Sequence, residues 1–309
     1  MPMSKKLVFV TGHEFGVRAL EGILASPPYL RGELEVPLTV GLDEKFSKRT
    51  VGYRSPREVA ADNEIFHVDT VDGTLCSSIE IIESVAPDFL AVIGWSRLVD
   101  PSVLKIPSGV ADRSVGRLRG SFSGIGMHPT CLPIGRGQAP IPWTIIKDLK
   151  RTALTVFFLA PTADSGPIIA QYPLEVRQGE TSGSLFYRFA HLHFRAGMEL
   201  AHQLTAPTVV SHPQDDSLAT VWPKRCPVDG LLRHDMTRAE LARTVRALLG
   251  PYPRSYVELD GEMVPVKRSF LPGSKRNQPV YPRSRVLSFE CADGTILLEL
   301  QGDHDSVGP

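Results

Sequence analysis

The chain has 309 residues, 34 basic and 34 acidic side chains, and 42% hydrophobic residues, a size that favours one large domain plus a smaller one. The neutral balance argues against nucleic acid, an anionic membrane or a polyanionic substrate as the main partner. No apolar run approaches the roughly 20 residues of a membrane span, and four scattered cysteines form no C-x-x-C pair, which favours a cytoplasmic protein without a structural zinc site or disulfide scaffold.

The first two thirds of the sequence alternate between strand and helix patterns. Residues 7–10 form a continuous β-prone run, typical of a strand buried on both faces, and apolar residues at helical spacing follow it. Further strands are expected at 38–40, 89–93, 155–159 and within 167–176, a short helix at 78–85, and a long covering helix at 182–204. We therefore predict an α/β fold with a doubly wound, mostly parallel, Rossmann-like sheet.

The last third is expected to form a separate β-rich domain. Residues 206–230 hold four prolines and little periodicity, which indicates a linker. Thr237 and Glu240 have the spacing of a capping box, and Asp-Gly pairs later in the chain occupy hairpin positions. We predict a catalytic domain at 1–205, a linker at 206–230, a small OB-like domain at 231–303 and a tail at 304–309.

Ligands of doubly wound sheets bind beyond the carboxyl ends of the strands, so the residues after each strand are the first candidates for a site. This rule selects Gly94, Trp95, Ser96 and Arg97, which follow the strand pattern at 89–93. The Trp95 indole and the nearby Leu98 suit a flat apolar ligand and the Arg97 guanidinium suits a charged tail, although each side chain could equally belong to the core or the surface. His13 follows the first strand at the same edge, and we interpret it as a loop residue.

The densest glycine and proline content lies in 124–137, around one histidine and one arginine. We expect an irregular loop there that presents a preorganised site. His128 can give or take a proton near neutrality or donate to an oxyanion, although a loop histidine can also simply cap backbone groups. Asp164, before Ser-Gly, is a turn former by itself, and beside a histidine it can orient the imidazole and accept a proton.

These motifs resemble those of the formyltransferases that use 10-formyltetrahydrofolate, a family that includes methionyl-tRNA formyltransferase and the amino-sugar N-formyltransferases. The resemblance spans nearly the whole chain and is strongest at 128–133, 136–143 and 164–169. One position departs from the family pattern, because the usual Asn-x-His is Gly126-Met127-His128 here. The missing amide would help to hold the formyl oxygen, and we expect a backbone N–H or a water molecule to take its place, since Gly126 allows close backbone approach.

The resemblance implies roles for individual residues. His128 matches the active-site histidine, Asp164 the catalytic aspartate, and Gly126 the position of the third catalytic member. The implied cofactor-binding residues are Trp95, Ser96, Arg97, Leu98, Ala160, Thr162 and Ala163. The implied acceptor-binding residues are Pro129, Thr130, Arg136 and Gly137. No metal is required.

The implied activity is transfer of a formyl group from 10-formyltetrahydrofolate to the amine of a small metabolite, such as an amino sugar, including a nucleotide-linked one. Alternatives are a methionyl-tRNA formyltransferase, transfer of another one-carbon or carbamoyl-like group, and a non-catalytic folate-binding relative. Cys131, close to His128, offers a less favoured thiol nucleophile. Residues 112–123, with Arg117 and Arg119, are interpreted as an insertion that either contacts an acidic acceptor or is simply solvated.

Overall fold

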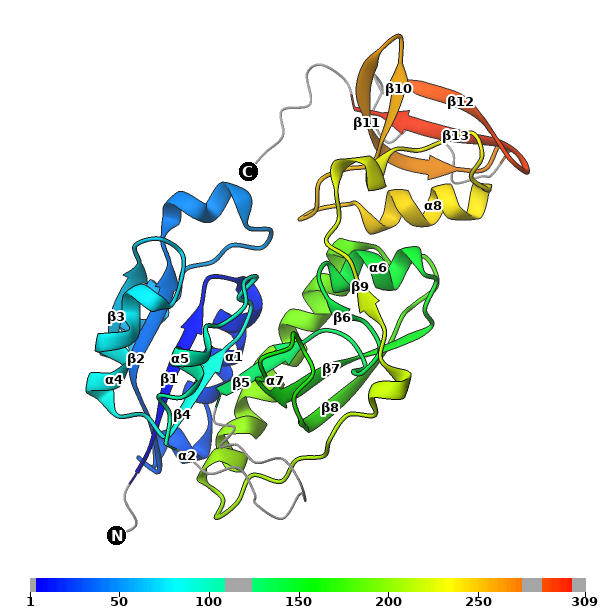
Figure 1. Ribbon diagram of the computed structural model, residues 1–309. Helices are drawn as coiled ribbons and strands as arrows, with labels where there is room; N and C mark the ends of the chain where they lie inside the picture. Colours follow the sequence, from blue (N-terminus) through cyan, green and yellow to red (C-terminus); the bar gives the residue numbers. More distant parts are fainter. Residues whose placement is uncertain (1–3, 109–123, 274–284, 302–309) are drawn as a thin grey trace. The chain divides into compact units, whose positions relative to one another are not determined.

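The computed structural model describes residues 4–108, 124–273 and 285–301 (Figure 1). The chain divides into two compact units: residues 1–140, 151–174 and 187–222 form the first, and residues 141–150, 175–186 and 223–309 the second. The insertion at 112–123 and the tail at 304–309 lie outside the described residues. Within the described part of the chain, no helix is long and apolar enough to cross a membrane.

The first unit is built on a seven-stranded sheet with the order β3-β2-β1-β4-β5-β7-β8. Its strands are β1 (Lys5–Thr11), β2 (Leu34–Leu42), β3 (Phe66–Thr70), β4 (Phe89–Val92), β5 (Gly124–His128), β7 (Arg151–Phe158) and β8 (Ile168–Glu175). β1 to β5 pair in parallel, whereas β5 and β7 run antiparallel. The prediction of a doubly wound, mostly parallel sheet is confirmed.

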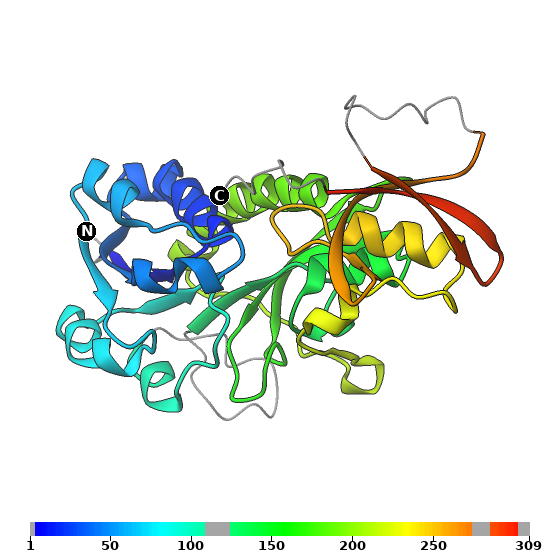
Figure 2. The same cartoon turned by 90° about the horizontal axis from the view of Figure 1, so that it is seen from above.

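Helices cover both faces of this sheet (Figure 2). They are α1 (Glu14–Leu24), α2 (Pro27–Leu30), α3 (Arg57–Asp62), α4 (Ile79–Val85), α5 (Pro101–Leu104) and, from residue 187 on, α7 (Ser182–Thr205). One face of β1 packs against α4 and α5 through a buried cluster that includes Val8, Ile82 and Val103. On the opposite side, α1 and α7 touch directly, because a Cβ at Gly22 would lie only 2.0 Å from a carbonyl oxygen of α7.

The second unit contains a four-stranded antiparallel sheet packed on one helix. Its elements are α6 (Pro140–Ile146), α8 (Arg238–Ala247), β10 (Tyr256–Leu259), β11 (Glu262–Phe270), β12 (Val286–Cys291) and β13 (Gly294–Leu300), with the strand order β10-β11-β13-β12. The predicted capping box is confirmed, since Thr237 and Glu240 exchange the two expected hydrogen bonds at the start of α8. Leu241 and Val245 of α8 pack into the core of the sheet. This arrangement confirms the predicted small β-rich domain.

Two features differ from what the sequence pattern predicted. Residues 124–128 are not an irregular loop but the buried strand β5. Glycine lowers the propensity for a strand, yet here Gly124 and Gly126 leave space that neighbouring side chains fill, so packing outweighs propensity. In addition, the segment at 206–230 is not only a connection, because β9 (Val221–Trp222) pairs with β6 (Arg136–Gly137).

Candidate active site

His128 is the last residue of β5, and its ring is fixed by a backbone carbonyl. The Nε2 atom lies 2.8 Å from the carbonyl oxygen of Gly135. Because a carbonyl oxygen only accepts, Nε2 must carry a hydrogen. The other ring nitrogen, Nδ1, faces Asp164, with 3.7 Å between Nδ1 and Oδ2. This arrangement leaves Nδ1 and the carboxylate as two groups between which a proton can be exchanged.

Asp164 lies in the turn between β7 and β8, in a conformation that non-glycine residues seldom adopt. Its φ is +52°, in the left-handed region. The Gly137 N–H donates to Oδ2 over 2.8 Å, which orients the carboxylate. The turn itself requires Gly166, where a Cβ would lie 1.7 Å from the carbonyl oxygen of Phe158. The backbone therefore holds the carboxylate beside the imidazole.

Gln214 braces this turn from the segment interpreted as a linker. Its Nε2 donates to the carbonyl oxygens of Asp164 and Gly166, each over 2.8 Å. Its Oε1 accepts from Arg136, with the shorter distance, 2.8 Å, to Nη2. Arg136 also pairs with Asp216 over 2.6 Å. Sequence reasoning missed Gln214, because no local pattern links it to a turn about 50 residues earlier.

The loop after β5 is held closely by the rest of the first unit. Gly137 has φ of +108°, and a Cβ there would lie 2.4 Å from the carbonyl oxygen of Trp222. Of the four residues expected to bind the acceptor, Pro129, Thr130 and Arg136 are buried. The fourth, Gly137, is half-buried and directs its N–H at Asp164. Arg136 donates to Gln214, and Thr130 Oγ1 donates to the Gly135 carbonyl oxygen that also contacts His128. An acceptor-binding role for the four residues stays a prediction.

Gly126 lies on the same side of β5 as His128, because side chains alternate along a strand. A Cβ at Gly126 would approach Leu159 Cδ2 to 2.8 Å and Phe157 Cζ to 3.0 Å. Apolar side chains therefore fill the space in which an amide side chain would lie. The expectation that the backbone at Gly126 approaches a ligand stays a prediction.

The residues expected to bind the cofactor surround the ends of β4 and β7. Trp95 is partly buried and packs against the same apolar cluster as Ile82 and Val103. Ser96 is exposed, and Leu98 is 74% exposed. The Arg97 guanidinium lies over the Phe46 ring and donates to the Gly73 carbonyl oxygen over 2.9 Å. On the other segment, Ala160 is half-buried, and Thr162 and Ala163 are exposed next to Asp164.

Two further observations concern the site's surroundings. His13, interpreted from the sequence as a loop residue, is the N-cap of α1, and Gly94 packs directly against its Cβ. Across the described ranges, no group of three or more histidine, cysteine or acidic side chains is placed to hold a metal ion. Cys131 is exposed on the loop that follows His128.

Comparison with known proteins places this fold among formyltransferases. Residues 59–199 match the model of the Formyl transferase family. A methionyl-tRNA formyltransferase of Syntrophus aciditrophicus is 29% identical over 188 residues, which cover 61% of this chain and 56% of that protein. The chain thus matches just over half the length of that relative.

Two solved structures share the fold over almost the whole chain. WlaRD, a sugar 3N-formyl transferase, has a TM-score of 0.67 at 12% identity and covers 98% of this chain and 100% of its own. The N-formyltransferase from Helicobacter canadensis has a TM-score of 0.68 at 15% identity and covers 97% and 100%. By its matched segment, relatives and fold, the chain is similar to the formyltransferases, a family of enzymes that take their formyl group from 10-formyltetrahydrofolate.

Proposed function

We propose that the chain is an N-formyltransferase that moves the formyl group of 10-formyltetrahydrofolate to the amine of a small metabolite, with amino sugars as the leading class of acceptor. The observation that carries the proposal is the His128–Asp164 pair, with 3.7 Å between Nδ1 and Oδ2. The Gly137 N–H and Gln214 hold the carboxylate and its turn in place. Such fixed geometry is what acid–base catalysis of acyl transfer needs.

The reaction makes one carbon–nitrogen bond and breaks another. The acceptor amine attacks the formyl carbon, whose oxygen becomes negatively charged, and the bond from that carbon to the folate nitrogen then breaks. Asp164 and His128 receive the proton released by the amine, and a proton goes to the departing folate nitrogen, which gives tetrahydrofolate. His128, when protonated, also places positive charge beside the negative oxygen. No covalent link to the protein is required.

A small acceptor is supported by the charge of the chain and by one of its structural neighbours. The equal numbers of basic and acidic residues give no surplus charge for an RNA backbone. The Helicobacter canadensis enzyme is described in complex with folinic acid and dTDP-3-aminofucose. The second candidate, methionyl-tRNA as acceptor, is favoured by the sequence relatives, which are methionyl-tRNA formyltransferases.

The test is to incubate the purified protein with 10-formyltetrahydrofolate and three kinds of acceptor: amino sugars, nucleotide-linked amino sugars, and methionyl-tRNA. Tetrahydrofolate release and the mass of each acceptor are followed together. We expect one formyl mass to be added to a small amine, and no formylation of methionyl-tRNA. Formylation of the tRNA alone would support the second candidate, and transfer to neither class would contradict both.

Two variants separate the proposed pair from a thiol mechanism. Asp164→Asn keeps an acceptor oxygen for the Gly137 N–H but removes the negative charge, so we expect turnover to fall at least about 100-fold. Cys131→Ser changes the exposed thiol near His128 and should retain nearly full activity. If Cys131→Ser abolished turnover and Asp164→Asn did not, the assigned chemistry would be refuted.

A further inference from the structure

Two arginines on one side of α8 lie close together with little negative charge to balance them. Arg243 and Arg246 are three residues apart in this helix, so their side chains are neighbours on its surface. The Arg243 side chain is only 22% exposed, and Arg246 is half-buried. A guanidinium stays charged in proteins, and two like charges this close destabilise each other unless an anion compensates them. The partners of the two side chains therefore decide whether the pair is complete.

Arg243 is incompletely satisfied by the described part of the chain. Its Nε atom is buried and has no hydrogen-bond partner there. Its ion pair with Asp148 is long, at 3.9 Å between Nη1 and Oδ2, which exceeds a hydrogen bond. Asp148 is also engaged by Lys150, whose Nζ donates to Oδ1 over 2.8 Å. A buried donor without an acceptor is costly, so the Arg243 guanidinium calls for an explanation.

Arg246 also lacks a close carboxylate among the described residues. Its Nε donates to the Glu180 carbonyl oxygen over 3.3 Å, which is a neutral acceptor. Burial lowers the pKa of Arg246, and the Arg243 charge acts in the same direction, while Asp148 opposes both. The two guanidiniums and Asp148 are thus within electrostatic range of one another.

The other charges of this region do not complete the pair. Glu240 interacts electrostatically with Arg243, but the Thr237 N–H and hydroxyl donate to its Oε2 over 2.8 and 2.7 Å in the helix cap. The Lys150 hydrogen bond lowers the pKa of Asp148, and the charges of the two arginines contribute in the same direction. Lys150 and the two arginines therefore share the Asp148 carboxylate, which leaves a surplus of positive charge beside α8.

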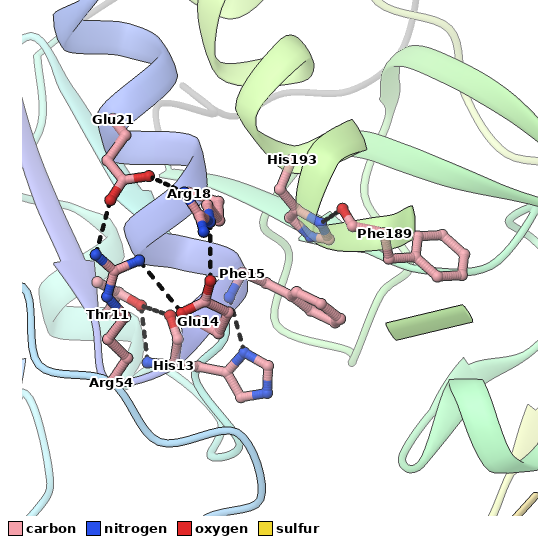
Figure 3. Close-up of polar contacts among 9 residues, drawn as sticks. All are labelled: Thr11, His13, Glu14, Phe15, Arg18, Glu21, Arg54, Phe189 and His193. Atoms are coloured by element: carbon pink, nitrogen blue, oxygen red, sulfur yellow. Dashed lines mark hydrogen bonds and ion pairs between the residues drawn. The ribbon is translucent and has the colours of Figure 1, made fainter. Parts of the chain in front are cut away.

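A second arginine pair in the chain shows what a balanced arrangement looks like. Arg18 and Arg54 both bind the carboxylates of Glu14 and Glu21, with N–O distances of 2.8 to 3.2 Å (Figure 3). Their side chains are 42% and 33% exposed, so both are more exposed than Arg243. The arginine that is removed furthest from water thus has the poorest partner, although the cost of burying a charge demands the reverse.

We propose that Arg243 and Arg246 form a binding site for a phosphate monoester or free phosphate, a dianion that the rest of the second unit does not supply. Guanidiniums bind phosphate through paired, charge-assisted hydrogen bonds, and the charge of about −2 on a phosphate monoester matches two unbalanced arginines. Because Arg243 Nε is buried, its flexible side chain turns to reach the ligand, and this turn breaks no hydrogen bond of Nε. The inference is independent of the proposed formyl transfer.

A phosphate monoester fits this surplus better than an RNA backbone does. Each phosphodiester carries a single charge, and proteins that hold a backbone neutralise many successive phosphates. Here the surplus is confined to one turn of α8 and lies beside the Asp148 carboxylate, which repels a continuous polyanion. A compact dianion can bind the two guanidiniums without extending past that carboxylate.

The test is calorimetric titration of the full chain with inorganic phosphate and with glucose 6-phosphate, in a phosphate-free buffer at constant ionic strength. Arg243→Met keeps the apolar stem and removes the guanidinium, and we expect it to bind both probes at least about 10-fold more weakly. Arg243→Lys keeps the charge without the planar fork and should bind less tightly than wild type. Arg254→Met, at an exposed arginine of the same unit, is the matched control and should bind as wild type does.

Melting temperatures separate a ligand site from a structural arginine. Arg243→Met removes an unbalanced charge, so without phosphate its melting temperature should equal or exceed that of wild type. Phosphate should raise the melting temperature of wild type and of Arg254→Met, and leave that of Arg243→Met unchanged. A lower melting temperature of Arg243→Met without phosphate shows that the guanidinium is already satisfied within the fold, and this result overturns the inference.

The binding data also identify the source of the phosphate. Tighter binding of glucose 6-phosphate than of inorganic phosphate supports a phosphorylated metabolite, and equal or weaker binding supports free phosphate. Wild type that binds neither probe, or Arg243→Met that binds both as wild type does, overturns the inference. A short RNA oligonucleotide that binds more tightly than either probe, and loses affinity in Arg243→Met, contradicts a site for a compact dianion.

Discussion

His193 makes a specific prediction about stability in acid. Its side chain is 1% exposed, and burial lowers its pKa to about 3, with nearby His13 and His128 acting in the same direction. In the unfolded chain the ring recovers its ordinary pKa of about 6.5. Between these two values the unfolded state binds a proton that the folded state does not, so the stability contribution is complete above the unfolded value and is lost as the pH falls.

The size of the effect follows from the two pKa values. The His193 ring has a pKa of about 6.5 in the unfolded chain and about 3 in the folded protein. Lowering the pH from 7 to 5 therefore reduces the free energy of unfolding by about 2 kcal/mol. His13, with a folded pKa of about 4, removes a similar amount over the same interval. The replacement His193→Phe keeps a ring to stack on Phe15 and removes the titrating group. Between pH 7 and pH 5, we expect the free energy of unfolding of this variant to fall by about 2 kcal/mol less than that of wild type.

The assay is urea unfolding of wild type and variant at several pH values from 7 to 5, with stability taken as a difference between pH values for each protein. Any packing cost of the larger ring cancels in that difference. His191→Phe, at an exposed position of the same helix, is the matched control and should follow wild type. If His193→Phe lost as much stability as wild type on acidification, the claim that His193 is buried in its neutral form would be refuted.

Two substitutions test how the site is built. Gly126→Asn restores the family's usual residue, but its side chain must displace Phe157, so we expect a loss of about 1–3 kcal/mol in urea unfolding without a gain in kcat. Gln214→Leu removes the donor to the Asp164 carbonyl oxygen and the acceptor for Arg136. We expect the free energy of unfolding to fall by about 1–3 kcal/mol and kcat to fall at least about 10-fold. An unaltered value in either assay would contradict the bracing role.

Periodicity predicted the central elements of the fold because local composition there agrees with the final packing. The run at 7–10 became the centre of β1, and the stripe after it became α1. The edge strand β3 (Phe66–Thr70) was missed, since its sequence mixes polar and exposed residues and gives no clear strand pattern. Strand β5 was missed because its two glycines lower the strand propensity of the segment, and because its burial depends on pairing with residues distant in the sequence.

Some residues of the candidate site could likewise be predicted from local motifs, whereas others depend on contacts between distant parts of the chain. His128 and Asp164 stand within motifs that could be read along the chain, and the structure brings the two side chains together. The boundaries proposed at 205 and 230 stay predictions, although the segment between them contributes Gln214 to the first unit. No residue near Gln214 indicates its role, because the hydrogen bonds depend on how two distant turns meet.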